Sequence, residues 1–146
     1  MQVERIDRVV LAVNDIKESA RLFQNILGTK FDEYVEAKDL SIRVVYSSLG
    51  LQLNEATAPG SDVRKFIDRH GEGPYCLVLK VKDIAEARDE MKSKGMREVY
   101  YFQEGDLKEA IFHPKQTFGV MIVLCEYPDY HGATVAALRR QPQRLL

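Results

Sequence analysis

The fold is decided by the stretch Arg8-Val-Val-Leu-Ala-Val-Asn-Asp-Ile-Lys-Glu18, which returns 68 residues later as Cys76-Leu-Val-Leu-Lys-Val-Lys-Asp-Ile-Ala-Glu86. Six of the eleven aligned positions are identical. Each copy is a run rich in valine and leucine, followed by an aspartate and, three residues later, a glutamate. This order is typical of a strand that leads into a capped helix. The chain therefore contains two related modules.

Each copy continues through the same order of elements. Asp15 and Asp83 are predicted as helix N-caps, and Gly28 and Gly95 as the residues that end the helices. The side chains expected in the core recur at helical spacing: Ile16, Ala20, Phe23 and Leu27, then Ile84, Ala87 and Met91. Strands are expected at 30–35, 41–47 and 51–55 in the first module and at 98–103, 109–113 and 120–126 in the second. A short helix is expected at 63–70.

These elements predict an α+β fold of two β-α-β-β-β modules, joined into a curved mixed sheet that encloses a cup. The domain would span residues 1–128, with modules at 3–56 and 74–128 and a connector at 57–73. Residues 129–146 would form a C-terminal tail that the fold does not need. Strand alternation places Val9, Leu11 and Val13 under the first helix, with Leu51 and Leu53 on the same side. The cup would receive Arg8, Val10, Ala12, Gln52, Asn54, Cys76, Val78 and Lys80.

The composition bears on which partners and which cellular compartment are expected. The 146 residues carry 21 basic and 22 acidic side chains, a net charge of -1, which gives no electrostatic reason to expect nucleic acid or a membrane as partner. No apolar run approaches a membrane span, and the first residues lack the apolar core of a signal peptide. The two cysteines, Cys76 and Cys125, do not form a disulfide framework, so a reducing cytoplasm is expected.

Several stretches resemble the vicinal-oxygen-chelate (glyoxalase/bleomycin resistance/dioxygenase) superfamily, and within it the methylmalonyl-CoA epimerase-like branch. They are Ile6-Asp-Arg-Val-Val-Leu-Ala-Val13, Phe23-Gln-Asn-Ile-Leu-Gly28, Ser61-Asp-Val-Arg-Lys-Phe66 with His70, and Phe112-His-Pro-Lys115 leading to Gly119-Val-Met-Ile-Val123. The resemblance implies a homodimer and a small-molecule site in the cup.

The resemblance also implies a divalent metal with four protein ligands, at positions that fall here on Arg8, Gln52, Cys76 and Val123. Only Gln52 is of the kind that the family pattern requires. A guanidinium has no lone pair to donate, and valine offers no donor atom. The family's catalytic carboxylate falls near Arg43. We therefore expect a degenerate site with no metal and no cofactor.

Two interpretations of Arg8 stay open. It is either a strand residue whose stem covers apolar surface, or a fixed positive charge in the place of the metal. If Arg43 shares its face in the second case, the cup would suit a carboxylate, phosphate or enolate oxygen. Cys76 is either an inert core cysteine or a thiolate whose pKa Arg8 lowers.

Two hypotheses for the function follow. The first is a protein that binds a small anionic or acyl-CoA-like ligand without the family metal, through Arg8, Arg43, Gln52, Cys76 and Lys80. The alternative is an isomerase, epimerase or lyase with an altered metal site or an arginine-based site. Because no carboxylate or histidine occupies the cup positions carried over from the family, we expect no ordinary methylmalonyl-CoA epimerase activity.

Overall fold

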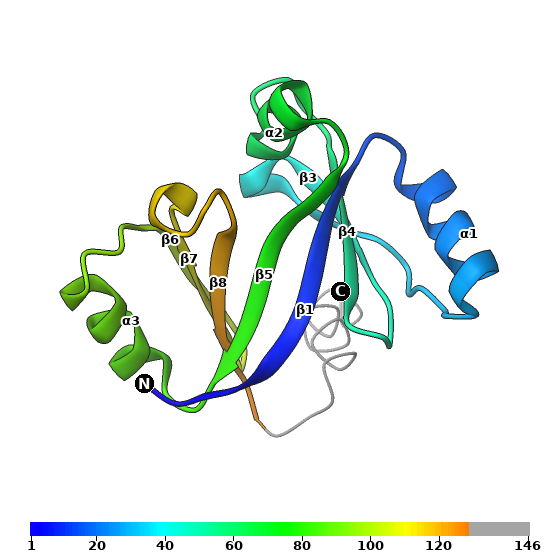
Figure 1. Cartoon of the computed structure of the whole chain (residues 1–146). Coiled ribbons are helices and arrows are strands. Elements are labelled where there is room, and N and C mark those ends of the chain that lie inside the picture. The colour runs from blue at the N-terminus through cyan, green and yellow to red at the C-terminus, as the bar shows by residue number, and fades with distance from the viewer. Residues whose placement is uncertain (129–146) are drawn as a thin grey trace. The chain divides into compact units, whose positions relative to one another are not determined.

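The computed structural model describes residues 1–128, and its elements follow one another in two similar rounds (Figure 1). They are β1 (Val3–Val13), α1 (Ile16–Leu27), β2 (Val35–Ala37), η1 (Lys38–Leu40), β3 (Ile42–Tyr46), β4 (Leu51–Ala56), α2 (Asp62–His70), β5 (Gly73–Val81), α3 (Ile84–Ser93), β6 (Glu98–Glu104), β7 (Leu107–Phe112), η2 (Pro114–Gln116) and β8 (Met121–Glu126). The tail predicted at 129–146 lies outside the described residues. None of the helices within residues 1–128 has the length and apolar character needed to cross a membrane.

Both long helices begin at the predicted N-caps, and α1 ends at the predicted Gly28, whereas α3 ends at Ser93 with Lys94 as its C-cap, one residue before the predicted Gly95. The Asp15 side chain accepts hydrogen bonds from the backbone N–H groups of Lys17 and Glu18, and Asp83 accepts one from Glu86. Gly28 ends α1 with a φ of 64°, a left-handed conformation that glycine adopts without the steric cost of a side chain. The local sequence therefore sets both helix starts and the end of α1.

The chain divides into two compact units. The continuous unit is Val9–Tyr75, and the split unit combines Met1–Arg8 with the described residues from Cys76 on. Strand order is β2-β3-β4-β1 in the continuous unit and β1-β5-β8-β7-β6 in the split unit, so β1 contributes to both. The β1–β4 and β5–β8 pairs are parallel, whereas β3–β4 and β7–β8 are antiparallel. The α+β class and the repeated modules are confirmed.

In the continuous unit, α1 packs on one face of the sheet. The buried residues of this core are Val13, Ile16, Val45 and Leu53, with Leu11, Ala20, Phe23, Phe31 and Leu51 packed against them. The predicted alternation is confirmed for Leu11, Val13, Leu51 and Leu53. It is wrong for Val9, which is 38% exposed and donates its backbone N–H to the carbonyl of Gly50.

In the split unit, α3 packs on one face of β5, β7 and β8 (Figure 1). The buried residues of this core are Val81, Ile84, Ala87, Ala110, Phe112 and Leu124, and Leu79, Met91, Met96, Tyr101 and Ile122 pack against them. Residues that alternate with these along each strand consequently lie on the face away from α3.

One predicted strand is wrong. The segment 30–35 forms only an isolated bridge, between Phe31 and Ser47, and the regular strand β2 starts at Val35. Phe31 is separated from Val35 by the charged residues Asp32 and Glu33, and its ring packs into the core beneath α1, so the segment has no alternating apolar pattern to hold a longer strand. Leu27 is also misassigned, since it is 51% exposed at the end of α1 rather than part of the core.

In each module, a glutamate on the last strand accepts a backbone hydrogen bond at the start of the long helix. Glu55, on β4, accepts the backbone N–H of Ile16 at 2.7 Å, and Glu126, on β8, accepts that of Ile84 at 2.7 Å. Each carboxylate also pairs with a cation on the neighbouring strand, Arg43 or Lys108. The same contact thus recurs at equivalent places in the two modules.

Candidate functional site

A charged row lies on the face of the split unit away from α3. Lys80 on β5 pairs in register with Cys125 on β8, which pairs in turn with Glu109 on β7. All three residues are buried. Two ionisable groups of opposite sign therefore share one row of an otherwise apolar sheet face, where Val78 and Val123 form the next row.

Arg8 joins this row through its guanidinium group. Its Nη2 donates to Glu109 Oε1 at 2.5 Å, and its Nη1 donates to Asp7 Oδ2 at 2.8 Å. The side chains of Arg8, Asp7 and Glu109 are 3%, 0% and 6% exposed. A buried guanidinium is thus fixed between two buried carboxylates, an arrangement in which each charge depends on the others for its stability.

Two further cations lie near these groups. The Tyr127 hydroxyl donates to Asp7 Oδ1 and accepts from Arg5 Nη2, whose guanidinium is 3.8 Å from Asp7. Burial, reinforced by the hydrogen bond to Asp7, raises the pKa of the Tyr127 hydroxyl well above its usual range. Lys80 is held by Glu4 at 2.8 Å, and its ammonium lies 4.9 Å from the centre of the Tyr127 ring.

Cys76 is a buried free cysteine whose surroundings favour the protonated thiol. Burial raises the pKa of its thiol well above the usual range, and the nearby Glu109 carboxylate raises it further. Arg8 acts in the opposite direction, as the sequence suggested, but does not outweigh these two effects. A thiol that stays protonated is a poor nucleophile and a poor metal ligand.

The continuous unit contains two of the predicted site residues, Gln52 and Arg43. They lie on opposite faces of its sheet. Gln52 Nε2 donates to Asn54 Oδ1 at 2.8 Å, and both residues are buried on the face away from α1. Arg43 pairs in register with Glu55, on the side of Leu53 and α1, and its guanidinium contacts Glu36 and Glu55 and stacks over Tyr34. The expectation that Arg43 faces the cup is wrong, because the register of β3 turns its side chain the other way.

The residues at the four metal positions do not fit a divalent cation. Arg8 is already paired with two carboxylates, Cys76 stays a thiol, and Val123 is a buried hydrocarbon. Within residues 1–128, no group of three or more histidine, cysteine, aspartate or glutamate side chains is placed to hold a metal ion. Of the four, only Gln52 carries a suitable oxygen.

Sequence reasoning missed Glu109, Asp7 and Tyr127. The signal for Glu109 was alternation, since Ala110 and Phe112 face α3 and the glutamate must face the other way. A charged residue at a buried strand position is uncommon and identifies a paired or functional group. Its partner Arg8 lies 101 residues away in the chain, so the pairing itself has no local signal.

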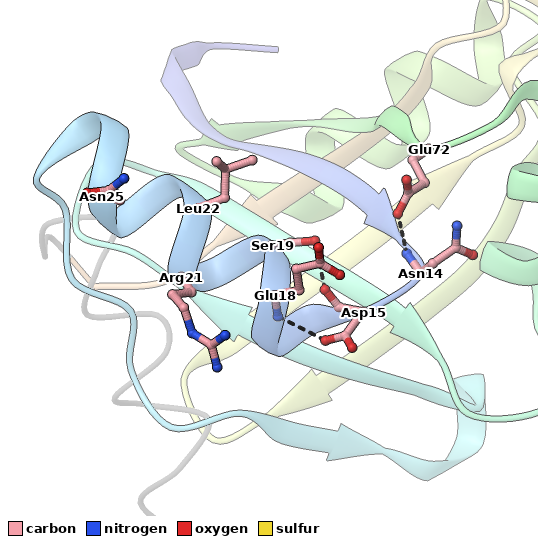
Figure 2. A pocket seen from close by; sticks show the side chains of 8 residues that line it. All are labelled: Asn14, Asp15, Glu18, Ser19, Arg21, Leu22, Asn25 and Glu72. Carbon is pink, nitrogen blue, oxygen red and sulfur yellow. Dashed lines mark hydrogen bonds between the residues drawn. The ribbon is translucent and has the colours of Figure 1, made fainter.

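A surface hollow of about 840 Å³ lies beside α1 in the continuous unit. Figure 2 shows its lining, which combines three carboxylates (Asp15, Glu18 and Glu72) with Arg21, Leu22, Ser19 and two asparagines, Asn14 and Asn25. Asp15 caps α1 and Glu72 accepts the backbone N–H of Asn14. Since Gln52 is not among the lining residues, the hollow is separate from the polar pair described above.

Comparison with known proteins identifies a protein family and related proteins. The family model of the Glyoxalase/Bleomycin resistance protein/Dioxygenase superfamily matches residues 7–120. The mitochondrial methylmalonyl-CoA epimerase of Homo sapiens is 30% identical over 82% of this chain and 72% of that protein.

Solved structures show the same fold. The methylmalonyl-CoA epimerase of Mycobacterium tuberculosis has a TM-score of 0.79 at 26% identity, covering 92% of this chain and 93% of that chain. A Streptomyces coelicolor methylmalonyl-CoA epimerase variant in complex with 2-nitronate-propionyl-CoA has a TM-score of 0.79 at 22% identity, covering 89% and 99%. Together, the duplicated module, the fold and the family match show that this chain belongs to the Glyoxalase/Bleomycin resistance protein/Dioxygenase superfamily.

Proposed function

We propose that this chain binds a small acyl ligand, a short carboxylate or an acyl-CoA thioester, at Arg8 and without the divalent metal of the family. The observation that carries the proposal is the buried guanidinium of Arg8, fixed between Asp7 and Glu109. A fixed guanidinium offers planar, charge-assisted hydrogen bonds to a carboxylate or a thioester oxygen. The acyl-CoA analogue bound to a structural relative supports the choice of ligand class.

The binding test uses a matched pair of arginine variants. Arg8 and Arg43 each contact two carboxylates, but Arg43 lies on the α1 side of its own sheet. Calorimetric titration with malonate, propionyl-CoA and methylmalonyl-CoA is expected to show binding of at least one compound. Arg8→Lys should weaken that binding about tenfold or more, because lysine keeps the charge but loses the planar fork, whereas Arg43→Lys should leave it unchanged. Equal affinities in both variants would contradict the proposal.

The absence of metal is tested separately. Elemental mass spectrometry is carried out on protein purified without chelator, and again after incubation with cobalt and gel filtration. Because Arg8 and Val123 supply no donor atom, we expect far less than one ion per chain. A retained ion near one per chain would refute the metal-free site.

A second candidate function is favoured by one observation, the Glu109 carboxylate at 2.5 Å from the Arg8 guanidinium. A carboxylate base next to a guanidinium is the pair that enolisation of an acyl thioester requires. Glu109 would take the α-proton, the C–H electron pair would form the carbon–carbon double bond of the enolate, and the π pair of the thioester carbonyl would move to its oxygen, which accepts a hydrogen bond from Arg8. Return of a proton from Glu109 after exchange with solvent would replace the α-hydrogen.

The enzyme hypothesis predicts exchange. Proton NMR in D₂O would show loss of the α-proton signal of methylmalonyl-CoA in the presence of metal-free protein, and Glu109→Gln would abolish the exchange. Glu36→Gln, which removes an exposed carboxylate partner of Arg43, serves as the control. If the protein binds methylmalonyl-CoA without exchanging its α-proton, the isomerase function is refuted and the binding function still stands.

We also propose that the chain forms a homodimer, as the family resemblance suggests. Light scattering coupled to gel filtration would then give twice the chain mass of 16.7 kDa. A value equal to the chain mass at micromolar concentration would refute the dimer.

A further inference from the structure

An apolar row of side chains crosses the face of the split unit away from α3. It takes one uncharged residue from each of four neighbouring strands, in register: Tyr100 on β6, Ile111 on β7, Val123 on β8 and Val78 on β5. Residues paired in this way point to the same side of a sheet, and Ala110 and Phe112, which flank Ile111, belong to the core beneath α3. The whole row therefore lies on the opposite face, which also carries Glu109.

The apolar row is the immediate neighbour of the charged row of Lys80, Cys125 and Glu109. Ile111 and Glu109 are two residues apart on β7 and point to the same side, which separates them by about 7 Å. The Glu109 carboxylate accepts a hydrogen bond from Arg8 at 2.5 Å, so the guanidinium lies beside the same part of the sheet. A ligand whose carboxylate or thioester oxygen contacts Arg8 can extend its acyl chain over the apolar row.

Val123 occupies one of the four positions at which the family resemblance implies a metal ligand. It is 4% exposed and its partner Val78 is 1% exposed, whereas Tyr100 and Ile111 are half-buried. At the β6 end, the rings of Tyr100 and Phe102 lie 5.9 Å apart. A hydrocarbon surface of this kind gives a cation no ligand, but it is stabilised by contact with methylene groups that leave water. The residue that departs from the family's metal site thus belongs to a surface suited to a hydrocarbon chain.

We propose that the apolar row selects the acyl chain of the ligand, and that this chain is a hydrocarbon longer than propionyl. The inference rests on the proposed binding function, in which Arg8 holds the carboxylate or thioester oxygen. Four strands spaced by about 4.8 Å make the row roughly 14 Å long, well beyond the reach of a three-carbon chain. Val123 and Ile111 contact the chain, and binding forms and breaks no covalent bond.

The test is a series of straight-chain CoA thioesters that differ only in the number of methylene groups: acetyl-, butyryl-, hexanoyl- and octanoyl-CoA. Titration calorimetry should show the dissociation constant falling about two- to fourfold per added methylene until the row is covered. The heat capacity change on binding should become more negative along the series, because burial of apolar surface has that signature. Equal affinities across the series, or affinities that fall with chain length, would overturn the role of the apolar row and leave the proposed function intact. Failure of every member to bind would refute the proposed function and the inference together.

Matched valine variants locate the effect. Val123→Thr keeps the size and the β-branching but places a hydroxyl in the apolar row, and it should lower the ratio of hexanoyl-CoA to acetyl-CoA affinity about threefold or more. Val99→Thr makes the same change at a residue of β6 that is 44% exposed and outside the row, and it should leave the ratio unaltered.

The anchor and the row are separated by a third variant. Arg8→Lys should weaken all members of the series by a similar factor, because every member presents the same thioester oxygen, and so should leave the ratio unaltered. The series on the unmodified protein needs no variant, so the inference stays testable if Val123→Thr does not fold. A chain-length gain that Val123→Thr leaves unaltered would overturn the assignment of the apolar row.

Discussion

The glutamate that holds the start of α3 makes a quantitative prediction about stability. Glu126 Oε2 accepts the backbone N–H of Ile84, a residue that is 2% exposed, and Oε1 accepts from Lys108 Nζ at 2.7 Å. Glu126→Ala would leave that backbone N–H without its acceptor in a buried position. This costs about 1–3 kcal/mol, and loss of an anion at a helix N-terminus adds about 0.3–1 kcal/mol.

We therefore expect Glu126→Ala to lower the free energy of unfolding by about 2–3 kcal/mol. Glu126→Gln keeps an acceptor oxygen and loses only the charge, whose pairing with Lys108 is partly exposed, so it should cost no more than about 1 kcal/mol. Urea unfolding followed by circular dichroism measures both values, with an unchanged slope against denaturant. Thermal unfolding of Glu126→Ala should shift downward by about 2–4 °C per kcal/mol.

Two variants sharpen this experiment. Glu55→Ala repeats the change at the equivalent place, where the acceptor of the Ile16 N–H is removed, and should cost a similar amount. Glu33→Ala removes an exposed carboxylate and should stay within about 0.5 kcal/mol of the unmodified protein. A loss below about 0.5 kcal/mol in Glu126→Ala, or equal losses in the Ala and Gln variants, would refute the reasoning.

Three further outcomes are expected. Arg8→Met should lower the free energy of unfolding in urea by about 3–5 kcal/mol, because it removes the buried cation that Asp7 and Glu109 share, whereas Arg43→Met should cost about 1 kcal/mol or less; equal losses would contradict the buried pairing. Cys76 should react with a thiol reagent at neutral pH only after unfolding, since burial raises its thiol pKa, and fast labelling of the folded protein would be the contrary result. The hydrogen bonds from Arg88 lower the pKa of the Glu98 carboxyl below its usual 4.5. The pair therefore stabilises the fold above pH 4.5, and this stabilisation should be lost as the pH falls through the lowered pKa. Glu98→Gln should reduce the dependence of the free energy of unfolding on acid pH, and an unaltered pH profile would be evidence against the pairing.

Much of the fold was predictable because its signals are local. Asp15 and Asp83 cap helices through their own side chains, and Gly28 ends α1 through its backbone conformation. These effects act within a few residues and can be recognised in any sequence. The duplicated stretch then places each helix against the strand before it.

The candidate site was less predictable because it depends on register and on distant pairing. Arg43 falls on the α1 side because strands alternate, so an alignment shifted by one position moves a side chain to the other face. Glu109 acquires its role only from Arg8, a partner 101 residues away. The four metal positions, by contrast, could be assessed from residue chemistry alone, since no environment gives a guanidinium or an isopropyl group a lone pair.

The division of β1 between the two units has a consequence for how the protein is made. Residues 1–8 belong to a unit whose other members begin at Cys76, and Glu109, one of the two carboxylate partners of Arg8, is synthesised 101 residues after it. At roughly 5–20 residues per second, the ribosome needs about 5–20 s to complete that interval. The continuous unit can fold during this time, while Asp7 and Arg8 stay in water. The pairing of Arg8 with Glu109 can therefore form only after the continuous unit has been synthesised, and a peptide of residues 1–8 added in trans should rescue a chain that lacks them.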